Sequence, residues 1–417
     1  MSETTTVPAG LEQPLELPRG GRLANRLAKA AMSEQLGDRA NGPTDDLVRL
    51  YDRWGRDGAG LVITGNVMVD RRHLGEPRNV VVEDDRDLDG LRRWATAGQA
   101  HGARVWVQIN HPGRQAMWFA GGHRPVAPSA VAPKIPGFVT PRALTGDEIE
   151  EIVRRFAATA AIVQRAGFAG VQLHGAHGYL ISQFLSPLAN QRDDAWGGDP
   201  QRRRRFVIEV LRATRAAVGP DYPVGIKLNS ADFQRGGFSE EESADVLAAL
   251  ADEGVDLIEI SGGTYEAPAM VDAVGEGPQV RASTREREAY FLDYAERVRE
   301  RLPGVPLMVT GGFRTAAAMG QAIRDGSCDL VGLGRPLAVA PDAAGELLGG
   351  GRARADAGEK RLGVRSLDGA IDLYWHTRQL HRIGAGREPR PGEPAWRTAA
   401  AMVVDNGWGA LRRRRGG

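Results

Sequence analysis

The segment Gly170-Val-Gln-Leu-His-Gly-Ala-His-Gly-Tyr179 joins a short apolar run to a cluster of polar and aromatic side chains. Before it, Ile149, Ile152, Val153 and Phe156 fall at helical spacing, which predicts a helix leading into a strand. A strand flanked by helices is the unit of a parallel α/β fold. The same unit recurs along the chain, and this recurrence decides the fold.

The repeat of strand and helix occurs eight times. The predicted strands are Leu27–Ala31, Leu61–Gly65, Val105–Asn110, Gly170–Gly175, Val224–Asn229, Leu257–Gly262, Pro306–Gly311 and Leu330–Gly334. The predicted helices are Asp45–Gly55, Leu88–His101, Gly146–Arg165, Gln201–Val218, Ser239–Asp252, Thr284–Arg301, Ala316–Arg324 and Asp342–Leu348. Eight such units predict a closed (β/α)8 TIM barrel over residues 23–348, in which chemistry belongs at the C-terminal ends of the strands.

Two regions lie outside the repeat. Residues 1–22 contain three prolines and are predicted to be an extended lead-in. Residues 349–417 form a C-terminal extension with helical patches at Leu367–Ile383 and Thr398–Val404, expected to pack on the barrel or on a neighbouring subunit of a homo-oligomer. His376 and His381 fall in the first patch, which we interpret as a surface helix.

Composition excludes several classes of function. The 54 Lys and Arg residues balance 53 Asp and Glu residues, so no overall field favours nucleic acid or an anionic membrane. Cys328 is the only cysteine, which excludes an internal disulfide and a cysteine-bound iron–sulfur cluster or zinc site. No signal peptide or apolar span is visible, so we expect a cytoplasmic protein.

The end of the fourth predicted strand carries the most chemical information. His174 and His177 can direct ring N–H groups at one oxygen, which polarises a carbonyl or stabilises an oxyanion. Tyr179 adds a proton donor that is neutral at pH 7. The same His-x-x-His spacing occurs in metal sites, but the later strands offer no matching carboxylate or third histidine. Histidines that are merely satisfied in the core are the other alternative.

Two further signals concern a bound ligand, the first its phosphate and the second its negative charge. Gly312 and Gly334-Arg335 follow the last two strands, where barrels of this fold bind phosphate groups. Lys227 lies in the apolar fifth strand, where a buried ammonium needs a negative partner. A reduced flavin is such a partner, and a Schiff-base lysine is the competing interpretation.

The segment from His174 to Asn190, continuing through Trp196-Gly-Gly to Phe206, resembles the Old Yellow Enzyme family of flavin-dependent ene reductases. Asn25-Arg26, His111-Pro-Gly-Arg114 and Gly334-Arg335 extend the resemblance over about residues 10 to 345. It implies a non-covalently bound FMN, NAD(P)H as reductant and a small enone-type or nitroalkene substrate whose activated C=C bond is reduced.

The resemblance also implies a role for individual residues. The backbone of Ala30, Ala31, Met32, Ser33 and Gly65 would line the flavin ring. Gln108 and Lys227 would contact its pyrimidine portion, and Gly312, Gly334 and Arg335 would hold its phosphate. His174 and His177 would bind the substrate carbonyl, and Tyr179 would donate the proton.

Several positions depart from the pattern of the family. Ser33 replaces the usual Thr or Cys, Lys227 replaces Arg, and Thr64-Gly65-Asn66 is unusual for the second strand, which weakens the contact expected at Gly65. The missing cysteines indicate the single-barrel form without an iron–sulfur cluster. A related FMN enzyme acting as a dehydrogenase or demethylase, and a flavin-binding or ligand-binding barrel without catalysis, are the alternatives, and the presence of Tyr179 argues against the second.

Overall fold

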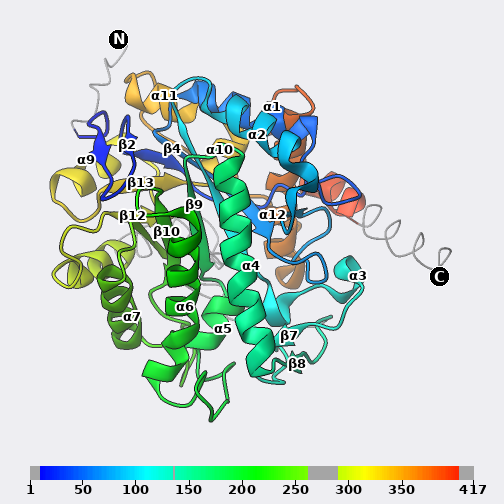
Figure 1. Cartoon of the computed structure of the whole chain (residues 1–417). Coiled ribbons are helices and arrows are strands. Elements are labelled where there is room, and N and C mark those ends of the chain that lie inside the picture. Colours follow the sequence, from blue (N-terminus) through cyan, green and yellow to red (C-terminus); the bar gives the residue numbers. More distant parts are fainter. Residues whose placement is uncertain (1–9, 135–136, 262–289, 403–417) are drawn as a thin grey trace.

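The computed structural model describes residues 10–134, 137–261 and 290–402. The wall of the barrel consists of β3 (Leu27–Lys29), β4 (Leu61–Met68), β6 (Arg104–Asn110), β9 (Gly170–Gly175), β10 (Val224–Asn229), β11 (Leu257–Ser261), β12 (Leu307–Thr310) and β13 (Leu330–Leu333). All neighbouring pairs are parallel, and β3 pairs with both β13 and β4, which closes the sheet. The predicted (β/α)8 barrel is confirmed (Figure 1).

Helices cover the outside of the barrel. Those that follow strands of the repeat include α1 (Asp45–Asp57), α2 (Leu88–Gln99), α4 (Gly146–Arg165), α6 (Pro200–Val218), α7 (Glu240–Asp252), α9 (Ala316–Arg324) and α11 (Ala343–Leu348). Thr145 and Ser239 form the capping boxes that begin α4 and α7, each satisfying free backbone N–H groups of its first turn. The helix predicted over Thr284–Arg301 begins outside the described residues, and residues 290–299 are helical. Within the described ranges, no helix is long and apolar enough to cross a membrane.

A short hairpin packs at the N-terminal ends of the barrel strands, and the interior of the barrel there is filled with apolar side chains. β1 (Leu15–Glu16) and β2 (Arg22–Leu23) pair antiparallel, so this part of the lead-in forms a small hairpin. Leu23 packs with Trp106 inside the barrel. A Cβ at Gly170 or Gly225 would lie only 2.4 or 2.7 Å from atoms of that indole, so both positions need glycine. A cavity is left at the C-terminal ends of the strands.

The C-terminal extension contributes α12 (Arg365–Gly384), which packs against α1 and against α10 (Pro336–Val339) (Figure 1). Its position matches the helical patch predicted over Leu367–Ile383. The interpretation of this helix as a surface element is wrong for His376, which is 4% exposed. Both ring nitrogens of His376 lie 2.7 Å from main-chain carbonyl oxygens, those of Asp372 and Ala357. The helix therefore has a buried face that looks toward the barrel.

Candidate active site

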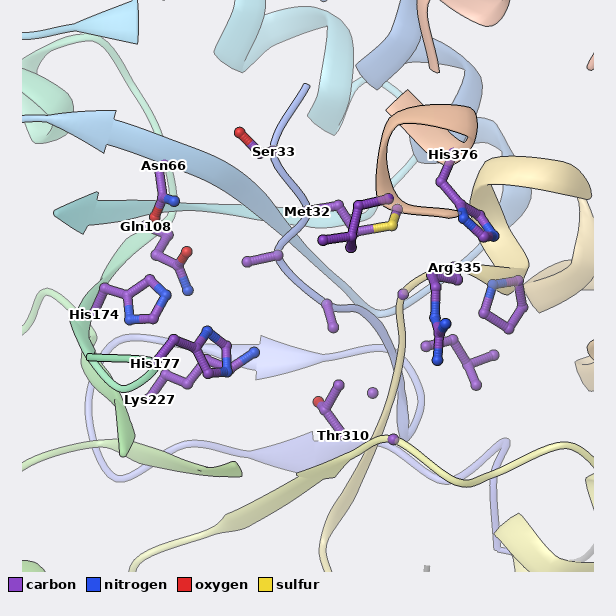
Figure 2. Close-up of a pocket in the computed structure, with 18 of the residues that line it drawn as sticks. Met32, Ser33, Asn66, Gln108, His174, His177, Lys227, Thr310, Arg335 and His376 are labelled. Atoms are coloured by element: carbon purple, nitrogen blue, oxygen red, sulfur yellow. The ribbon is translucent and has the colours of Figure 1, made fainter. Parts of the chain in front are cut away.

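A cavity of about 300 Å³ opens at the C-terminal ends of the barrel strands. Its wall contains every residue predicted to bind cofactor or substrate except Gly65; these are Ala30, Ala31, Met32, Ser33, Gln108, His174, His177, Tyr179, Lys227, Gly312, Gly334 and Arg335. Figure 2 shows His174, His177 and Lys227 on one side of the cavity and Arg335 on the other. The structure thus brings together predicted residues from six strand ends, while the role of each remains a prediction.

His174, His177 and Tyr179 form an aromatic cluster after β9. The ring centroids of the two histidines are 5.0 Å apart, and those of His174 and Tyr179 are 4.7 Å apart. His177 has a φ of 61°, a left-handed conformation that Asn229 supports by accepting the His177 backbone N–H at 3.2 Å. Tyr179 immediately precedes α5 (Leu180–Leu185), which fixes the direction of its ring. The left-handed conformation at His177 and the start of α5 after Tyr179 therefore bring the three rings together on one part of the wall.

Both histidines are neutral in the folded protein. Burial, followed by the neighbouring His177 and the Lys227 charge, holds the pKa of His174 well below its usual value. Burial and Lys227 act in the same direction on the pKa of His177. The Nδ1 atom of His174 accepts the N–H of Ala176 at 3.2 Å, so a neutral ring carries its proton on Nε2. The Nε2 atom of His177 lies 2.8 Å from the hydroxyl of Ser261.

Asn66 lies on the cavity wall, which the sequence did not predict. Its amide nitrogen donates to the hydroxyl of Tyr179 at 3.3 Å. The register between β4 and β6 shifts between Ile63 and Asn66, and this irregularity brings Asn66 rather than Gly65 to the cavity. The N–H of Gly65 donates to Glu34 at 2.7 Å, and a Cβ there would lie 2.2 Å from the carbonyl oxygen of Met32. Gly65 therefore packs against the segment after β3.

A buried ion pair lies at the cavity wall beside this cluster. Lys227 pairs with Glu259 at 2.9 Å, and both side chains are at most 2% exposed. The sequence prediction for Lys227 required a negative partner and named a ligand, whereas the protein supplies a carboxylate of its own. A carboxylate inside the apolar run of Leu257–Ser261 is the signal that could have revealed it.

The other end of the cavity has the features expected of an anion site. Gly311 and Gly312 have φ values of 109° and 82°, which place this turn in a conformation that favours glycine. Arg335 immediately precedes α10 and pairs with Asp372 of α12 at 3.0 Å. The hydroxyl of Thr310 is buried on this wall and has no hydrogen-bond partner within the described part of the chain. A ligand oxygen would satisfy it.

The C-terminal extension reaches the same end of the cavity. Leu373, His376, Thr377 and Leu380 of α12 contribute to the wall, and Figure 2 shows His376 close to Arg335. Sequence reasoning missed these residues because no local pattern indicates where a terminal helix docks.

Ser33 contacts Glu76 on the wall near the segment after β3. Burial raises the pKa of Glu76, which the contact with Ser33 partly offsets. The hydroxyl of Ser33 is therefore held by a carboxyl group at the edge of the cavity.

A second group of titratable side chains lies outside the cavity wall. Ligand atoms of Asp70, His73 and His111 are within 4.8 Å of one another, although they come from two different strand ends. The guanidinium of Arg72 already donates to both carboxylate oxygens of Asp70, at 2.6 to 3.0 Å. Burial lowers the pKa of His73 to about 4 and that of His111 to about 3. The group is an ion pair with two neutral imidazoles beside it.

Comparison with known proteins extends over the barrel and part of the extension. Residues 11–348 match the NADH:flavin oxidoreductase / NADH oxidase family. The NADH-dependent flavin oxidoreductase iliE of Hypocrea jecorina (strain QM6a) is 40% identical over 349 residues, covering 79% of this chain and 86% of that protein. The NADH-dependent flavin oxidoreductase iccE of Talaromyces variabilis is 40% identical over 356 residues, covering 79% and 84%. Among solved structures, morphinone reductase matches with a TM-score of 0.68 at 25% identity, covering 85% of this chain and 92% of its own.

Proposed function

The chain belongs to the NADH:flavin oxidoreductase / NADH oxidase family, the Old Yellow Enzyme family, and on that premise we propose that it is an NADH-dependent ene reductase. In this proposal FMN is bound in the cavity without a covalent link, and reduced nicotinamide and an alkene bind to it in turn. The alkene is activated by a conjugated carbonyl or nitro group. The observation that carries the proposal is the convergence of His174, His177 and Tyr179 on a wall that also holds Gln108 and Lys227.

The residues on the wall fit a flavin phosphate ester. Arg335 and the glycine turn at Gly312 would hold the phosphate, and the hydroxyl of Thr310 would gain the partner it lacks. Gln108, Lys227 and the backbone of Ala30–Ser33 would hold the ring. A bound flavin supplies hydride transfer, since it takes hydride from reduced nicotinamide and delivers it to an electron-poor carbon.

His174 and His177 would bind the oxygen of the substrate's activating group. The Nε2–H of His174 is a donor in a neutral ring, so it donates a hydrogen bond without moving a proton. Negative charge grows on the substrate oxygen as hydride arrives at the β-carbon, so a fixed donor stabilises the transition state more than the ground state. Loss of one such donor typically costs about 3 kcal/mol.

Tyr179 would complete the reaction by donating its phenolic proton to the α-carbon of the substrate. Its hydroxyl already accepts a hydrogen bond from the amide of Asn66, which orients the O–H bond away from that amide. A phenol is a suitable acid because it is neutral at pH 7 and can be reprotonated from solvent.

The test is to purify the protein, release its chromophore by denaturation and identify it, and then to measure NADH oxidation with 2-cyclohexenone, a maleimide and a nitroalkene. We expect stoichiometric FMN and saturable turnover of at least one alkene. A phenol that mimics the substrate oxygen should give a long-wavelength absorbance band, which the double variant His174→Ala/His177→Ala should lose. A protein that cannot be reconstituted with FMN, or a band unchanged in the double variant, would overturn the proposal.

A further inference from the structure

A chain of four buried side chains crosses the interior of the barrel and reaches the cavity wall at both ends. Lys227 pairs with Glu259 at 2.9 Å, Gln172 donates from Nε2 to the other oxygen of Glu259 at 2.8 Å, and Gln108 donates from Nε2 to Oε1 of Gln172 at 2.7 Å. All four are at most 2% exposed. Lys227 and Gln108 line the cavity, whereas Glu259 and Gln172 lie behind them.

The strand register makes the ion pair unavoidable. Lys227 lies directly opposite Glu259 in the ladder between β10 and β11, so both side chains point to the same side at the same height. An isolated buried ammonium costs several kcal/mol, and a buried carboxylate at this distance offsets that cost only if its other oxygen is also satisfied. Gln172 provides the second hydrogen bond. Glu259 therefore connects the two residues that line the cavity: it pairs with Lys227 directly and contacts Gln108 through Gln172.

Glu259 also sets the direction of the two amides. A carboxylate only accepts, so Gln172 must present its NH2 group to Glu259 and its carbonyl oxygen to Gln108. That oxygen in turn requires the NH2 group of Gln108. The Gln108 carbonyl is thereby turned away from Gln172, which suits it to accept a hydrogen bond from an imide N–H of a ring in the cavity.

We propose that Glu259 is a positioning residue that lowers the reduction potential of the bound flavin by neutralising Lys227, whereas its effect on Gln108 is confined to the direction of that amide. This inference rests on the proposed function, because it requires a flavin in the cavity. Two-electron reduction places negative charge on the flavin, and a free ammonium beside it would favour the reduced state. With Glu259 at 2.9 Å, Lys227 presents a neutral pair instead.

Other charged groups do not provide the same balance. Lys29 is another buried cation of the barrel; burial lowers its pKa to about 8, and the attraction of Glu34 opposes this shift in part. Its ammonium donates to the carbonyl of Ile63 at 2.7 Å and lies 4.2 Å from the ring centre of Trp54, outside the cavity wall. The histidines beside Lys227 are neutral, as described above. Glu259 is thus the carboxylate that compensates Lys227.

The experiment measures the midpoint potential of the FMN holoenzyme by equilibration with reference dyes, together with the dissociation constant of oxidised FMN. Glu259→Gln should raise the affinity for reduced relative to oxidised flavin at least tenfold, which corresponds to about 30 mV for two electrons. Glu259→Asp keeps the charge and should stay close to the wild type. Lys227→Met and the double variant Lys227→Met/Glu259→Gln should have the same potential within about 10 mV, or about twofold in the affinity ratio, because the cation on which Glu259 acts is gone.

Asp256→Asn is the matched control. Asp256 is fully buried on the segment just before β11 and pairs with Arg19 and Arg215, which are partly exposed, so the substitution removes a buried carboxylate charge outside the cavity wall. We expect it to lower thermal stability and leave the potential unchanged. If Glu259→Gln does not fold, the double variant is compared with Lys227→Met instead. A different potential in these two variants would show that Glu259 does not act through Lys227.

The failures are distinguishable. A wild-type protein that takes up no flavin refutes the proposed function. A wild type that holds FMN and reduces alkenes, with the same potential in Glu259→Gln, refutes only the role given to Glu259.

Discussion

Replacing Tyr179 by phenylalanine removes one hydroxyl from the cavity and leaves the ring in place. The side chain is 4% exposed and packs with its centroid 4.7 Å from that of His174, contacts that phenylalanine keeps. The hydroxyl receives a hydrogen bond from Asn66 at 3.3 Å, and losing one such bond costs about 1 kcal/mol of unfolding free energy. We therefore expect a folded variant with a slightly lower midpoint of thermal unfolding.

In Tyr179→Phe, reduction of the alkene should slow while reduction of the flavin by NADH should not. A positioned general acid contributes about 10²-fold to 10⁴-fold to the step it serves, so reduction of the alkene should slow by that factor. Hydride delivery from NADH needs no proton from Tyr179 and should change by less than about twofold. Anaerobic stopped-flow absorbance separates the two halves, because flavin colour is lost with NADH and regained with the alkene.

Tyr294→Phe is the control for this experiment. Tyr294 is 2% exposed and donates to the hydroxyl of Ser243 at 2.7 Å, so the same atom is removed from a buried hydrogen bond outside the cavity wall. Both halves of the reaction should proceed at the wild-type rate. Equal losses in both halves for Tyr179→Phe, or no loss in either, would show that the hydroxyl is not the proton donor.

Three further substitutions test the anion site, the acid stability and the packing of the barrel. Arg335→Met should weaken FMN binding about 10-fold to 100-fold, since a charge-assisted hydrogen bond is worth about 1.5 to 3 kcal/mol, whereas Arg354→Met, at a surface pair, should leave the dissociation constant unchanged in fluorescence titration. His111 has a pKa of about 3 in the folded protein against 6.5 when exposed, so as the pH falls below 6.5 the unfolded chain is protonated first. Protonation of His111 in the unfolded chain should therefore lower the free energy of unfolding by about 2 kcal/mol between pH 7 and 5. In urea titrations, His111→Asn should lack this part of the pH dependence. Gly225→Ala, whose Cβ would meet a buried indole at 2.7 Å, should cost about 1 to 3 kcal/mol, while Gly146→Ala, with open space, should cost little in the same measurement.

The barrel could be predicted from local patterns because each unit carries its own signals. The helices predicted over Gly146–Arg165 and Ser239–Asp252 begin within one residue of those bounds, because the N-caps Thr145 and Ser239 satisfy backbone groups of the first turn. Strand ends were less certain: β4 runs past Gly65 to Met68 through an irregularity that depends on its partner β6. That tertiary feature moved the cavity contact from Gly65 to Asn66.

The candidate site was predictable where residues follow strands directly. His174, His177 and Tyr179 lie at one strand end, and the fold brings strand ends together, so position in the repeat was sufficient. His376 was misplaced because its burial depends on where α12 docks, and an isolated helical pattern with polar residues does not indicate this. Local spacing therefore identified the centre of the site and not its periphery.

For the charged residues of the cavity, the sequence revealed the cations but not the carboxylates that pair with them. The sequence identified the cations Lys227 and Arg335, because each stands where a strand or its following turn should be apolar or glycine-rich. It did not identify their partners: Glu259 comes from the neighbouring strand and Asp372 from a helix near the end of the chain, at 2.9 and 3.0 Å. The buried Lys227 needs a compensating charge, and the partly exposed Arg335 also has one, so each cation reaches the cavity as half of an ion pair. Under the proposed function, we expect the flavin phosphate to compete with Asp372 for Arg335, and the reduced ring to compete with Glu259 for Lys227. Flavin affinity and reduction potential would then depend on two carboxylates that position in the strand repeat does not reveal.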